Sequence, residues 1–283
     1  MFFHFSGVEK HRPFVMVVDT TLPGSASNTF VLPLVVPSYK YNFIVEWGDG
    51  SREAQRNPTA TTVTHVYSSP GVYKIKIHGA GFGRVFGKLG ANGAQDAAKI
   101  TSIPTLGDLI WTGNAFNSGF RSLVNLASFD ASNAKVINLL NLNGLFSGCT
   151  SLNSVIDFDS SFVTGNLSNS FLNCSSFNSD VNLDTRSITA FDAMFSGCTS
   201  FKKDVSKFKI GSLVSAANMF LNADINDTGT TTRYDALLNS WAGQAYKTNV
   251  PFHAGLSKYS VAASAARATL VAAGWTITDG GLA

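Results

Sequence analysis

The sequence predicts a mainly β protein with short helices, built from an N-terminal β-sandwich, a solenoid of repeated coils and a small α/β cap. Three observations predict this fold class. Short β-branched and aromatic runs bounded by turn residues fill residues 14–80. A pattern with a period in the twenties recurs over residues 111–227. Two helical patterns alternate with short strand patterns over residues 228–283.

The repeat in the middle of the chain is clearest in three copies. They read LFSGCTSL, SFLNCSSF and MFSGCTSF and occupy residues 145–152, 170–177 and 194–201. Degenerate copies open the run at Ala115 and close it at Met219. The aromatic residues that lead the copies follow at steps of 30, 25, 24 and 25 residues: Phe116, Phe146, Phe171, Phe195 and Phe220. A fixed period of this length indicates a solenoid in which each repeat is one coil.

A cysteine follows the lead aromatic residue by three positions in each central copy: Cys149, Cys174 and Cys198. Ala223 takes this position in the closing copy, and Gly119 or Phe120 takes it in the opening copy. A disulfide needs Cβ atoms about 3.8 Å apart, whereas side chains stacked in register lie about 5 Å apart. Zinc sites use four ligands, and no histidine accompanies these cysteines. We therefore interpret them as buried free thiols and expect no metal and no cofactor.

A second apolar residue lies about twelve positions beyond each lead aromatic residue and precedes a polar one. The apolar residues are Phe129, Phe158, Leu183 and Phe208. The polar residues are Asp130, Asp159, Asp184 and Lys209. This pairing predicts one short strand per coil, with the apolar side chain inward and the polar side chain in solvent. An alternative reading is a ladder of carboxylates that serves a glycan-degrading enzyme.

The repeats follow one order of features: MF-x-x-C-x-x-F, then an aspartate-bearing strand, then Ile-Thr or Val-Thr before the next copy. This order resembles the BspA-like class of leucine-rich repeats. The resemblance covers residues 116–225. Members of that class are surface-displayed binding proteins of bacteria, protists and phages. The resemblance therefore implies a leucine-rich-repeat-type solenoid with a binding role.

Five runs near the N-terminus have the composition of β-strands: Phe14–Thr20, Thr29–Val36, Tyr41–Trp47, Val63–Tyr67 and Val72–Ile77. In the third run the aromatic and β-branched residues alternate, which predicts that they share one face: Tyr41, Phe43, Val45 and Trp47. Turn residues at 48–51 and 68–71 separate the later runs. Several short alternating strands at this spacing predict an antiparallel β-sandwich.

The residues W-G-D-G-S, followed by T-H-V-Y-S-S-P-G-V-Y-K-I-K-I, resemble the motif of PKD-type, immunoglobulin-like domains. The motif residues are Trp47, Gly48, Asp49 and Gly50. The resemblance implies a spacer or adhesion module. We expect Trp47 to fill the core and Asp49 to hydrogen-bond its own turn. The alternative, Asp49 as a calcium ligand, lacks an aspartate-rich loop to supply the remaining oxygens.

Residues 81–110 are glycine-rich and predict a linker and the start of the solenoid, with a strand near Arg84–Phe86. These glycines lack the spacing of a phosphate-binding loop. We expect Trp111 to close the open end of the solenoid core, because terminal repeats differ from internal ones. Residues 1–13 form an N-terminal arm whose charged residues are unlike a secretory signal.

The cap is predicted from helical periodicity and capping residues. Four apolar residues fall at i, i+3, i+4 and i+7: Tyr234, Leu237, Leu238 and Trp241. Thr232 is the expected N-cap of this helix and Gly243 its end. Ser260 is the expected N-cap of a second helix that ends at Gly274. Short strands are expected at 250–253 and 275–278.

Composition narrows the possible functions. Charged residues make up 14% of the chain, against about 25% in typical proteins, so the surface is neutral and rich in hydroxyl groups. A net charge of +3 is too small to indicate nucleic acid as a partner. The sequence contains no apolar run of 18 residues, so we expect no membrane insertion. Histidines are scattered, and no motif of a hydrolase occurs. We expect a protein that is not an enzyme and has no catalytic residues.

Two functional hypotheses follow. The first is a structural or binding protein on the surface of a phage particle, as capsid decoration, fibre or tail adhesin. Its partners are other virion proteins or a protein or glycan of the host surface, and a homo-oligomer is compatible with it. The second is a bacterial cell-surface adhesin of the BspA-like class. A glycan-degrading tail enzyme is the weaker alternative.

Overall fold

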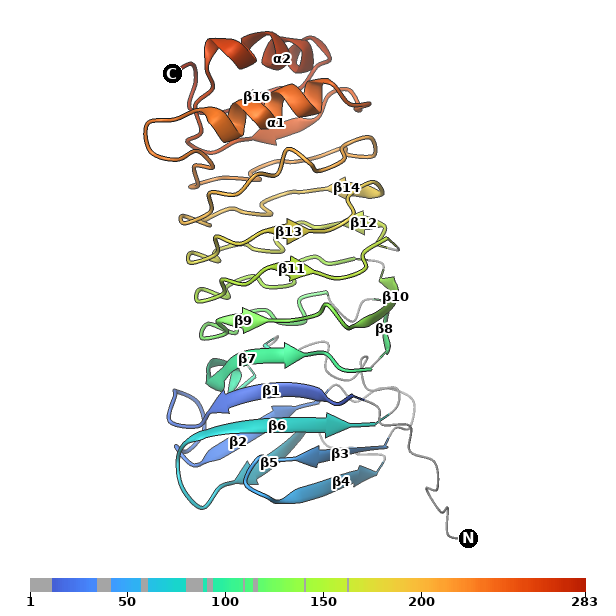
Figure 1. Cartoon of the computed structure of the whole chain (residues 1–283), viewed down its shortest axis with the longest axis vertical. Coiled ribbons are helices and arrows are strands. Elements are labelled where there is room, and N and C mark those ends of the chain that lie inside the picture. The colour runs from blue at the N-terminus through green and yellow to red at the C-terminus, as the bar shows by residue number, and fades with distance from the viewer. Residues whose placement is uncertain are drawn as a thin grey trace.

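The computed structural model describes residues 12–34, 42–56, 61–79, 89–90, 94–108, 110–113, 117–139, 141–161 and 163–283. Within them the chain forms short strands β1 to β16 and two α-helices, which confirms the mainly β prediction. Figure 1 shows sheets at one end of an elongated molecule, stacked coils in its middle and the helices at the other end. Most of the predicted N-terminal arm and the strand expected near Arg84–Phe86 lie outside the described residues.

Six strands form the N-terminal sheets: β1 (Phe14–Asp19), β2 (Thr29–Pro33), β3 (Asn42–Glu46), β4 (Arg52–Arg56), β5 (Thr62–Val66) and β6 (Val72–His78). Strands β4, β3, β6 and β1 lie side by side in one sheet, and β2 pairs with β5 in another. The five runs predicted as strands are confirmed at this level. Strand β4 was not predicted, because its sequence REAQR is polar and mostly exposed and carries no apolar alternation.

The first sheet does not stop at the N-terminal region. Strand β1 pairs antiparallel with β6 on one side and with β7 (Ile100–Thr105) on the other. Strand β7 then pairs in parallel with β9 (Ser128–Phe129) of the first repeat. The predicted linker therefore contains a strand that joins the N-terminal sheet to the coils through backbone hydrogen bonds (Figure 1).

Parallel ladders run along two sides of the coils. On one side, β11 (Ile156–Asp157) pairs with β13 (Val181–Asn182). On a second side, β8 (Ile110–Gly113) pairs with β10 (Lys135–Leu139), and β12 (Gly165–Asn166) pairs with β14 (Ile188–Ala190). The sequence predicted one strand per coil. The second ladder escaped prediction because its strands are only two to five residues long and show no alternating pattern.

The predicted strand position is off by two residues in the middle coils. The paired residues are Ile156–Asp157 and Val181–Asn182, whereas Asp159 and Asp184 follow in turns. The Asp159 carboxylate accepts the backbone N–H of Ser161 at 3.1 Å. Asp130 and Asp184 accept a backbone N–H two residues on in the same way. These aspartates are turn residues, because a short carboxylate two positions before an N–H closes a local hydrogen bond.

The first coil has a different register from the one predicted from the sequence. Phe116 lies outside the described residues, and Phe120 occupies the lead position instead. The Phe120 N–H donates to Leu145 at 3.0 Å, as the Phe146 N–H donates to Ser170 at 2.8 Å. The position of the cysteine is then filled by Leu123 rather than by Gly119 or Phe120. The period becomes 26, 25, 24 and 25 residues, which is more regular than the steps measured from Phe116.

Two positions in each coil have a left-handed backbone. The first position lies two residues before the lead phenylalanine and is occupied by Ser118, Gly144, Asn169, Ala193 and Asn218. The second position lies two residues after the lead phenylalanine and is occupied by Ser122, Gly148, Asn173, Gly197 and Asn222. Glycine and asparagine tolerate positive φ best, so this geometry explains why the repeats alternate between F-S-G-C and F-L-N-C.

Alanine at one of these positions gives a stability prediction. Ala193 has φ of 50°, where an L residue with a Cβ is strained. We expect Ala193→Gly to raise the free energy of unfolding by about 0.5–1 kcal/mol, since relief of strain exceeds the entropic cost of glycine. Urea denaturation provides the measurement. Ala217→Gly, at a position without positive φ, is the control and is expected to destabilise by a similar amount. Equal destabilisation by both changes would contradict the prediction.

The cap continues the stack. It contains α1 (Thr232–Ala242), β15 (Pro251–His253), α2 (Val261–Ala272) and β16 (Thr276–Thr278). Ala216 of the last repeat donates its N–H to Pro251 at 2.9 Å, and β15 pairs in parallel with β16. The four predicted apolar residues of α1 are all buried.

The predicted ends of the helices are mostly confirmed. Ser260 caps α2 by accepting the N–H of Ala262, and Gly243 follows the end of α1. Thr232 is not the N-cap of α1. Thr231 holds that position and donates its hydroxyl to Asp235, one turn into the helix.

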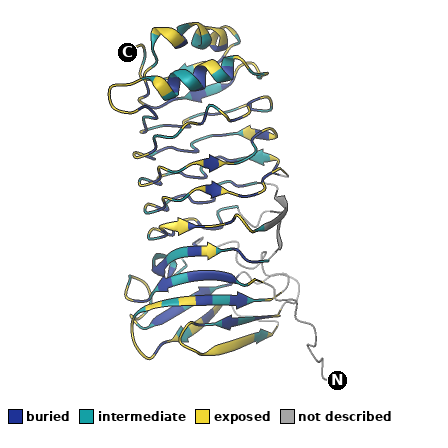
Figure 2. Cartoon of the chain, in the orientation of Figure 1, coloured by how far each residue is buried: buried dark blue, intermediate teal, exposed yellow. Residues whose placement is uncertain are grey.

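Buried side chains run through the length of the molecule. Figure 2 shows buried residues in the N-terminal sheets, in the coils and on the inward faces of the helices. They form one continuous hydrophobic cluster. Neither helix in the described residues has the length and apolar character needed to cross a membrane.

Candidate functional site

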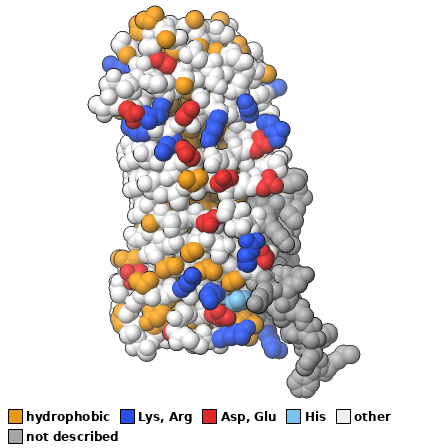
Figure 3. Space-filling view, in the orientation of Figure 1, with side chains coloured by type: hydrophobic (Ala, Val, Ile, Leu, Met, Phe, Trp, Pro, Cys, Tyr) orange, Lys and Arg blue, Asp and Glu red, His pale blue; other side chains and the backbone are white. Residues whose placement is uncertain are grey.

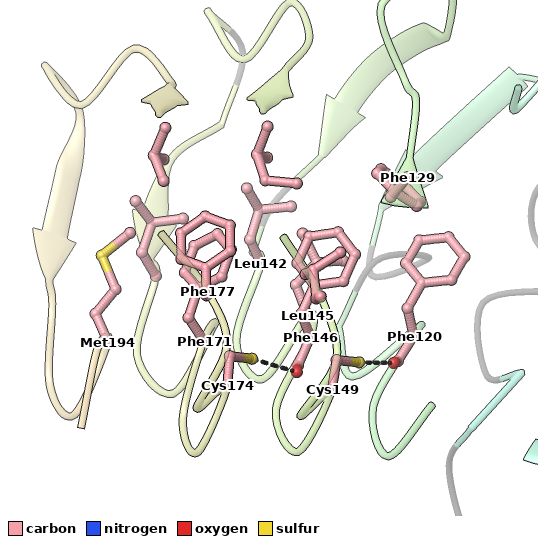
Figure 4. Packing of buried hydrophobic residues seen from close by; sticks show 14 of the residues in the cluster. Phe120, Phe129, Leu142, Leu145, Phe146, Cys149, Phe171, Cys174, Phe177 and Met194 are labelled. Atoms are coloured by element: carbon pink, nitrogen blue, oxygen red, sulfur yellow. Dashed lines mark hydrogen bonds between the residues drawn. The ribbon is translucent and has the colours of Figure 1, made fainter. Parts of the chain in front are cut away.

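The lead phenylalanines form a column inside the coils. Ring centroids of successive members lie 5.8, 5.7, 5.3 and 5.5 Å apart. The members are Phe120, Phe146, Phe171, Phe195 and Phe220, all with no exposed surface. Figure 4 shows Phe120, Phe146 and Phe171 stacked with their rings on the same side of the chain. Because no ring reaches solvent, this column holds the coils together and cannot touch a ligand.

The three cysteines are buried free thiols, as the sequence interpretation expected. Each thiol donates to the carbonyl of the lead phenylalanine one coil earlier. The distances are 2.9 Å from Cys149 to Phe120, 3.0 Å from Cys174 to Phe146 and 2.9 Å from Cys198 to Phe171 (Figure 4 draws the first two). Burial raises the pKa of the Cys174 thiol to about 12. A thiol that stays protonated is neither a nucleophile nor a metal ligand.

The W-G-D-G motif lies in the turn between β3 and β4. Trp47 is 1% exposed and stacks on the His65 ring, with centroids 4.6 Å apart and planes 5° apart. Gly48 has φ of +92°, and a Cβ there would lie 2.8 Å from the Lys74 carbonyl oxygen. Gly50 also has positive φ but faces open space. The first glycine is therefore required by close backbone approach and the second by turn geometry.

Asp49 is fully engaged with its neighbours. One carboxylate oxygen accepts the backbone N–H of Ser51 at 2.8 Å and its hydroxyl at 2.5 Å. The other oxygen lies 2.8 Å from Nε2 of His65. Partial burial opposes ionisation, but the hydrogen bonds from Ser51 and His65 outweigh it and lower the pKa of Asp49 to about 2. The turn prediction is confirmed. No group of three metal-ligating side chains occurs in the described residues.

The lowered pKa of Asp49 gives a pH prediction. The folded pKa of about 2 lies below the ordinary aspartate pKa of 3.8, so the ionised carboxylate stabilises the fold above about pH 4. This stability is lost as the pH falls from 3.8 through 2. We expect the free energy of unfolding of wild type to exceed that of Asp49→Asn by about 1 kcal/mol at neutral pH, a value reduced by solvent screening. The difference is expected to shrink as the pH falls from 3.8 through 2. Denaturation curves at several pH values measure this. A difference independent of pH would contradict it.

One side of the coils presents exposed polar side chains in register. Asn182 donates its amide to Asp157 at 3.5 Å, and Lys207 donates to Asn182 at 2.7 Å. We call the exposed residues Asp157, Asn182 and Lys207, with the neighbouring turns 159–161 and 184–186, the ladder face. Figure 3 shows Lys, Arg and Asp side chains scattered over this side, with uncharged surface between them.

Asp159 and Asp184 of the ladder face both have lowered pKa values. A side-chain hydrogen bond from Ser161 lowers the pKa of Asp159, and one from Arg186 lowers the pKa of Asp184. Glycoside hydrolysis needs one carboxyl with a raised pKa as general acid. Neither aspartate meets this requirement, and both carboxylates are used within their own turns.

An open cavity of about 610 Å³ lies where the N-terminal loops meet the first coil. Its described lining includes Pro23, Gln95, Ser122 and Val124, and Arg121 is its titratable residue. No carboxylate contributes to this lining. The described part of this lining therefore offers no pair of groups for acid–base chemistry.

Sequence reasoning missed two charged clusters, since the groups that they hydrogen-bond lie far away in the chain. Lys99 and Asp96, both with side chains 0% exposed, hold the loop between β1 and β2. In the cap, Asp279 accepts from the Tyr234 hydroxyl at 2.9 Å and from Arg267 at 2.8 Å. Both clusters are internally satisfied and stabilise loops.

The repeat region matches one family. The family is described as "Mycoplasma protein of unknown function, DUF285", and the match covers residues 114–233. This span contains the coils from the first phenylalanine of the column to the start of α1. Searches of curated proteins and of solved structures gave no match.

Proposed function

We propose that this protein is a non-enzymatic structural and binding protein on the surface of a phage particle. It is a capsid decoration, fibre or tail adhesin that contacts other virion proteins or the host surface. Its ladder face is the binding surface. The observation that carries the proposal is the single hydrogen-bonded sheet that runs from β4 to β9, because it joins the N-terminal sheets to the coils.

An elongated molecule of this kind suits a spacer that displays one side to partners. The ladder face is polar and exposed, Asp184 pairs with Arg186, and Asp157 and Lys207 both bond the Asn182 amide, which favours recognition by hydrogen bonds over strong electrostatic attraction. The buried thiols support assembly in a reducing cytoplasm, as a phage component would experience.

We also propose finer descriptions of the two β regions. The N-terminal sheets correspond to an immunoglobulin-like, PKD-type sandwich, which the buried Trp47 and the Asp49 turn support. The coils correspond to a BspA-like, leucine-rich-repeat-type solenoid, which the phenylalanine column and the parallel ladders support.

Immunogold electron microscopy with an antibody to this chain tests the location. Purified particles and uninfected cells from the same source are labelled side by side. We expect label on particles, at a defined position on head or tail. Label confined to the surface of uninfected cells would refute the virion proposal.

A bacterial cell-surface adhesin is the second candidate. The match of residues 114–233 to a family described from Mycoplasma favours it. The same microscopy separates the two candidates, because an adhesin labels uninfected cells.

A further inference from the structure

The outer face of the N-terminal sheet is built from every second residue of its strands. Directly paired residues of antiparallel strands point to the same side of a sheet. Glu46 on β3 pairs with Arg52 on β4 and with Lys76 on β6. Their chain neighbours Val45 and Ile77 are fully buried, so the three charged side chains point away from the core. The same alternation places three more titratable residues on this side, which we call the basic face: Arg56, Lys74 and His78.

The carboxylates on the described part of the basic face are engaged locally. Glu46 lies 3.8 Å from the Lys76 ammonium and 3.3 Å from Nε2 of His78. Asp19, at a corner of the face, accepts the backbone N–H of Thr21 at 2.9 Å and its hydroxyl at 2.6 Å. These contacts leave the other cations of the face without a carboxylate partner.

Three cations of the basic face make no ion pair with any described residue: Arg52, Arg56 and Lys74. Figure 3 shows Lys and Arg side chains among hydrophobic ones over this sheet. Charged side chains on the edge strand β4 oppose pairing with another chain. Lys74, however, lies on β6 between β3 and β1, where there is no edge to protect. Edge protection alone therefore does not account for the positive charge of this face.

The unpaired cations are too far apart to hold one small anion. Arg52 and Arg56 are four residues apart on one strand, which corresponds to about 14 Å. Lys74 lies on β6, two strands away from β4, which adds about 10 Å across the sheet. Ala54 and Ile44 pair with each other between the two arginines and form an aliphatic row. A ligand that meets all three charges is therefore a chain that carries repeated anionic groups.

The uncharged residues of the basic face narrow the class of polymer. They include no Phe, Tyr or Trp in the described strands, whereas single-stranded nucleic acids bind through stacking on such rings. The face also lacks a helix or ribbon that could enter the groove of a duplex. Aliphatic side chains such as Ile44 can contact the C–H groups of a sugar ring. A guanidinium group binds a planar carboxylate through two parallel N–H bonds.

We propose that the basic face binds a linear acidic polysaccharide whose sugars carry carboxylates. Arg52, Arg56 and Lys74 bind successive carboxylates, and the row of Ala54 and Ile44 contacts the sugar rings between them. Charge complementarity selects this occupant, because the face offers three unpaired cations to a polymer of opposite charge. This surface is separate from the ladder face and does not depend on where the protein is displayed. Failure of its test would therefore leave the immunogold result unaffected.

Calorimetric titration of the full chain with polygalacturonate tests the ligand class. We expect saturable binding that weakens as the salt concentration rises, because salt screens exposed charges. The methyl ester of the same polymer keeps the sugars and removes the charge, and we expect it not to bind. Polyaspartate, duplex DNA and phosphatidylserine vesicles are titrated in parallel. Tighter binding of any of these three, equal binding of the ester, or no binding of polygalacturonate would overturn the proposal.

Neutralisation of the unpaired cations tests the surface. We expect the triple variant Arg52→Gln/Arg56→Gln/Lys74→Gln to bind polygalacturonate at least about tenfold more weakly than wild type. All three positions are exposed, and circular dichroism checks that the variant is folded. If it is not folded, Arg52→Gln/Lys74→Gln replaces it, with an expected loss of at least about fivefold.

A matched control removes the same charge elsewhere. Its three substitutions lie at exposed lysines of the last coil and the cap: Lys209→Gln, Lys247→Gln and Lys258→Gln. We expect this control to keep the affinity of wild type within about twofold. An equal loss in the control, or full affinity in the basic-face variant, would show that net charge or another surface holds the polymer and would overturn the proposal.

Discussion

Phe171→Ala is expected to lower the free energy of unfolding by about 3–5 kcal/mol. Phe171 has no exposed surface and lies in the middle of the phenylalanine column. Its ring contacts Phe177 at a centroid distance of 4.6 Å, Phe195 at 5.3 Å and Phe146 at 5.7 Å. Truncation removes these contacts and leaves a cavity that backbone hydrogen bonds between coils keep from collapsing. Chemical denaturation followed by circular dichroism measures the change.

Cys174→Ala is the matched control in the same coil. It removes one sulfur atom and the thiol donor to the Phe146 carbonyl. That carbonyl still accepts the Cys149 N–H at 2.9 Å, so it is not left without a donor. We expect a cost of about 1 kcal/mol, because alanine already occupies the same position at Ala223. A loss as large as that of Phe171→Ala would contradict the interpretation of the cysteines as small buried side chains.

The sequence predicted the coils because their core depends on local spacing. Phe146, Phe171 and Phe195 recur at a nearly fixed step, and each is followed by a small residue and another apolar one. The first copy was misaligned because A-F-N-S-G imitates the F-S-G of the later copies. The backbone hydrogen bond from the Phe120 N–H to the Leu145 carbonyl, which repeats the one from Phe146 to Ser170, is the feature that identifies Phe120.

The candidate site was less predictable. The turn at Asp49 follows from adjacent residues, because the carboxylate and the N–H that it accepts are two positions apart. The ladder face depends on which residues become neighbours between coils. Lys207 reaches Asn182 across 25 positions, and a shift of a single residue in register would separate them. The two-residue error in the predicted strands therefore hid this contact.

The charged cluster before β7 is the clearest case of a feature invisible to local patterns. Lys99 donates to the carbonyls of Ser25, Ala26 and Thr29 at 3.1, 2.9 and 2.8 Å. Asp96 accepts the N–H groups of Ser25 and Val31, each at 2.6 Å. Every partner lies more than sixty residues away in the chain. In the sequence, Asp96 and Lys99 are an ordinary charged pair in a glycine- and alanine-rich segment.

Asp96→Ala is expected to lower the free energy of unfolding by about 3–5 kcal/mol. The Lys99 ammonium lies 3.7 Å from the Asp96 carboxylate, and both side chains have no exposed surface. Removal of the carboxylate leaves a buried positive charge without its counter-ion and leaves the Ser25 and Val31 N–H groups without an acceptor. Chemical denaturation provides the value, with native-state hydrogen exchange to locate the loosened region between β1 and β2.

Asp184→Ala is the control, because Asp184 pairs with an Arg186 side chain that is 72% exposed. An exposed ion pair of this kind contributes at most about 1 kcal/mol. The double variant Asp96→Ala/Lys99→Met removes both buried charges, and we expect it to be less destabilised than the sum of the two single variants. If Asp96→Ala cost no more than Asp184→Ala, the pair would not fix the loop. The junction of the N-terminal sheet with the coils would then depend on the β1–β7 and β7–β9 ladders.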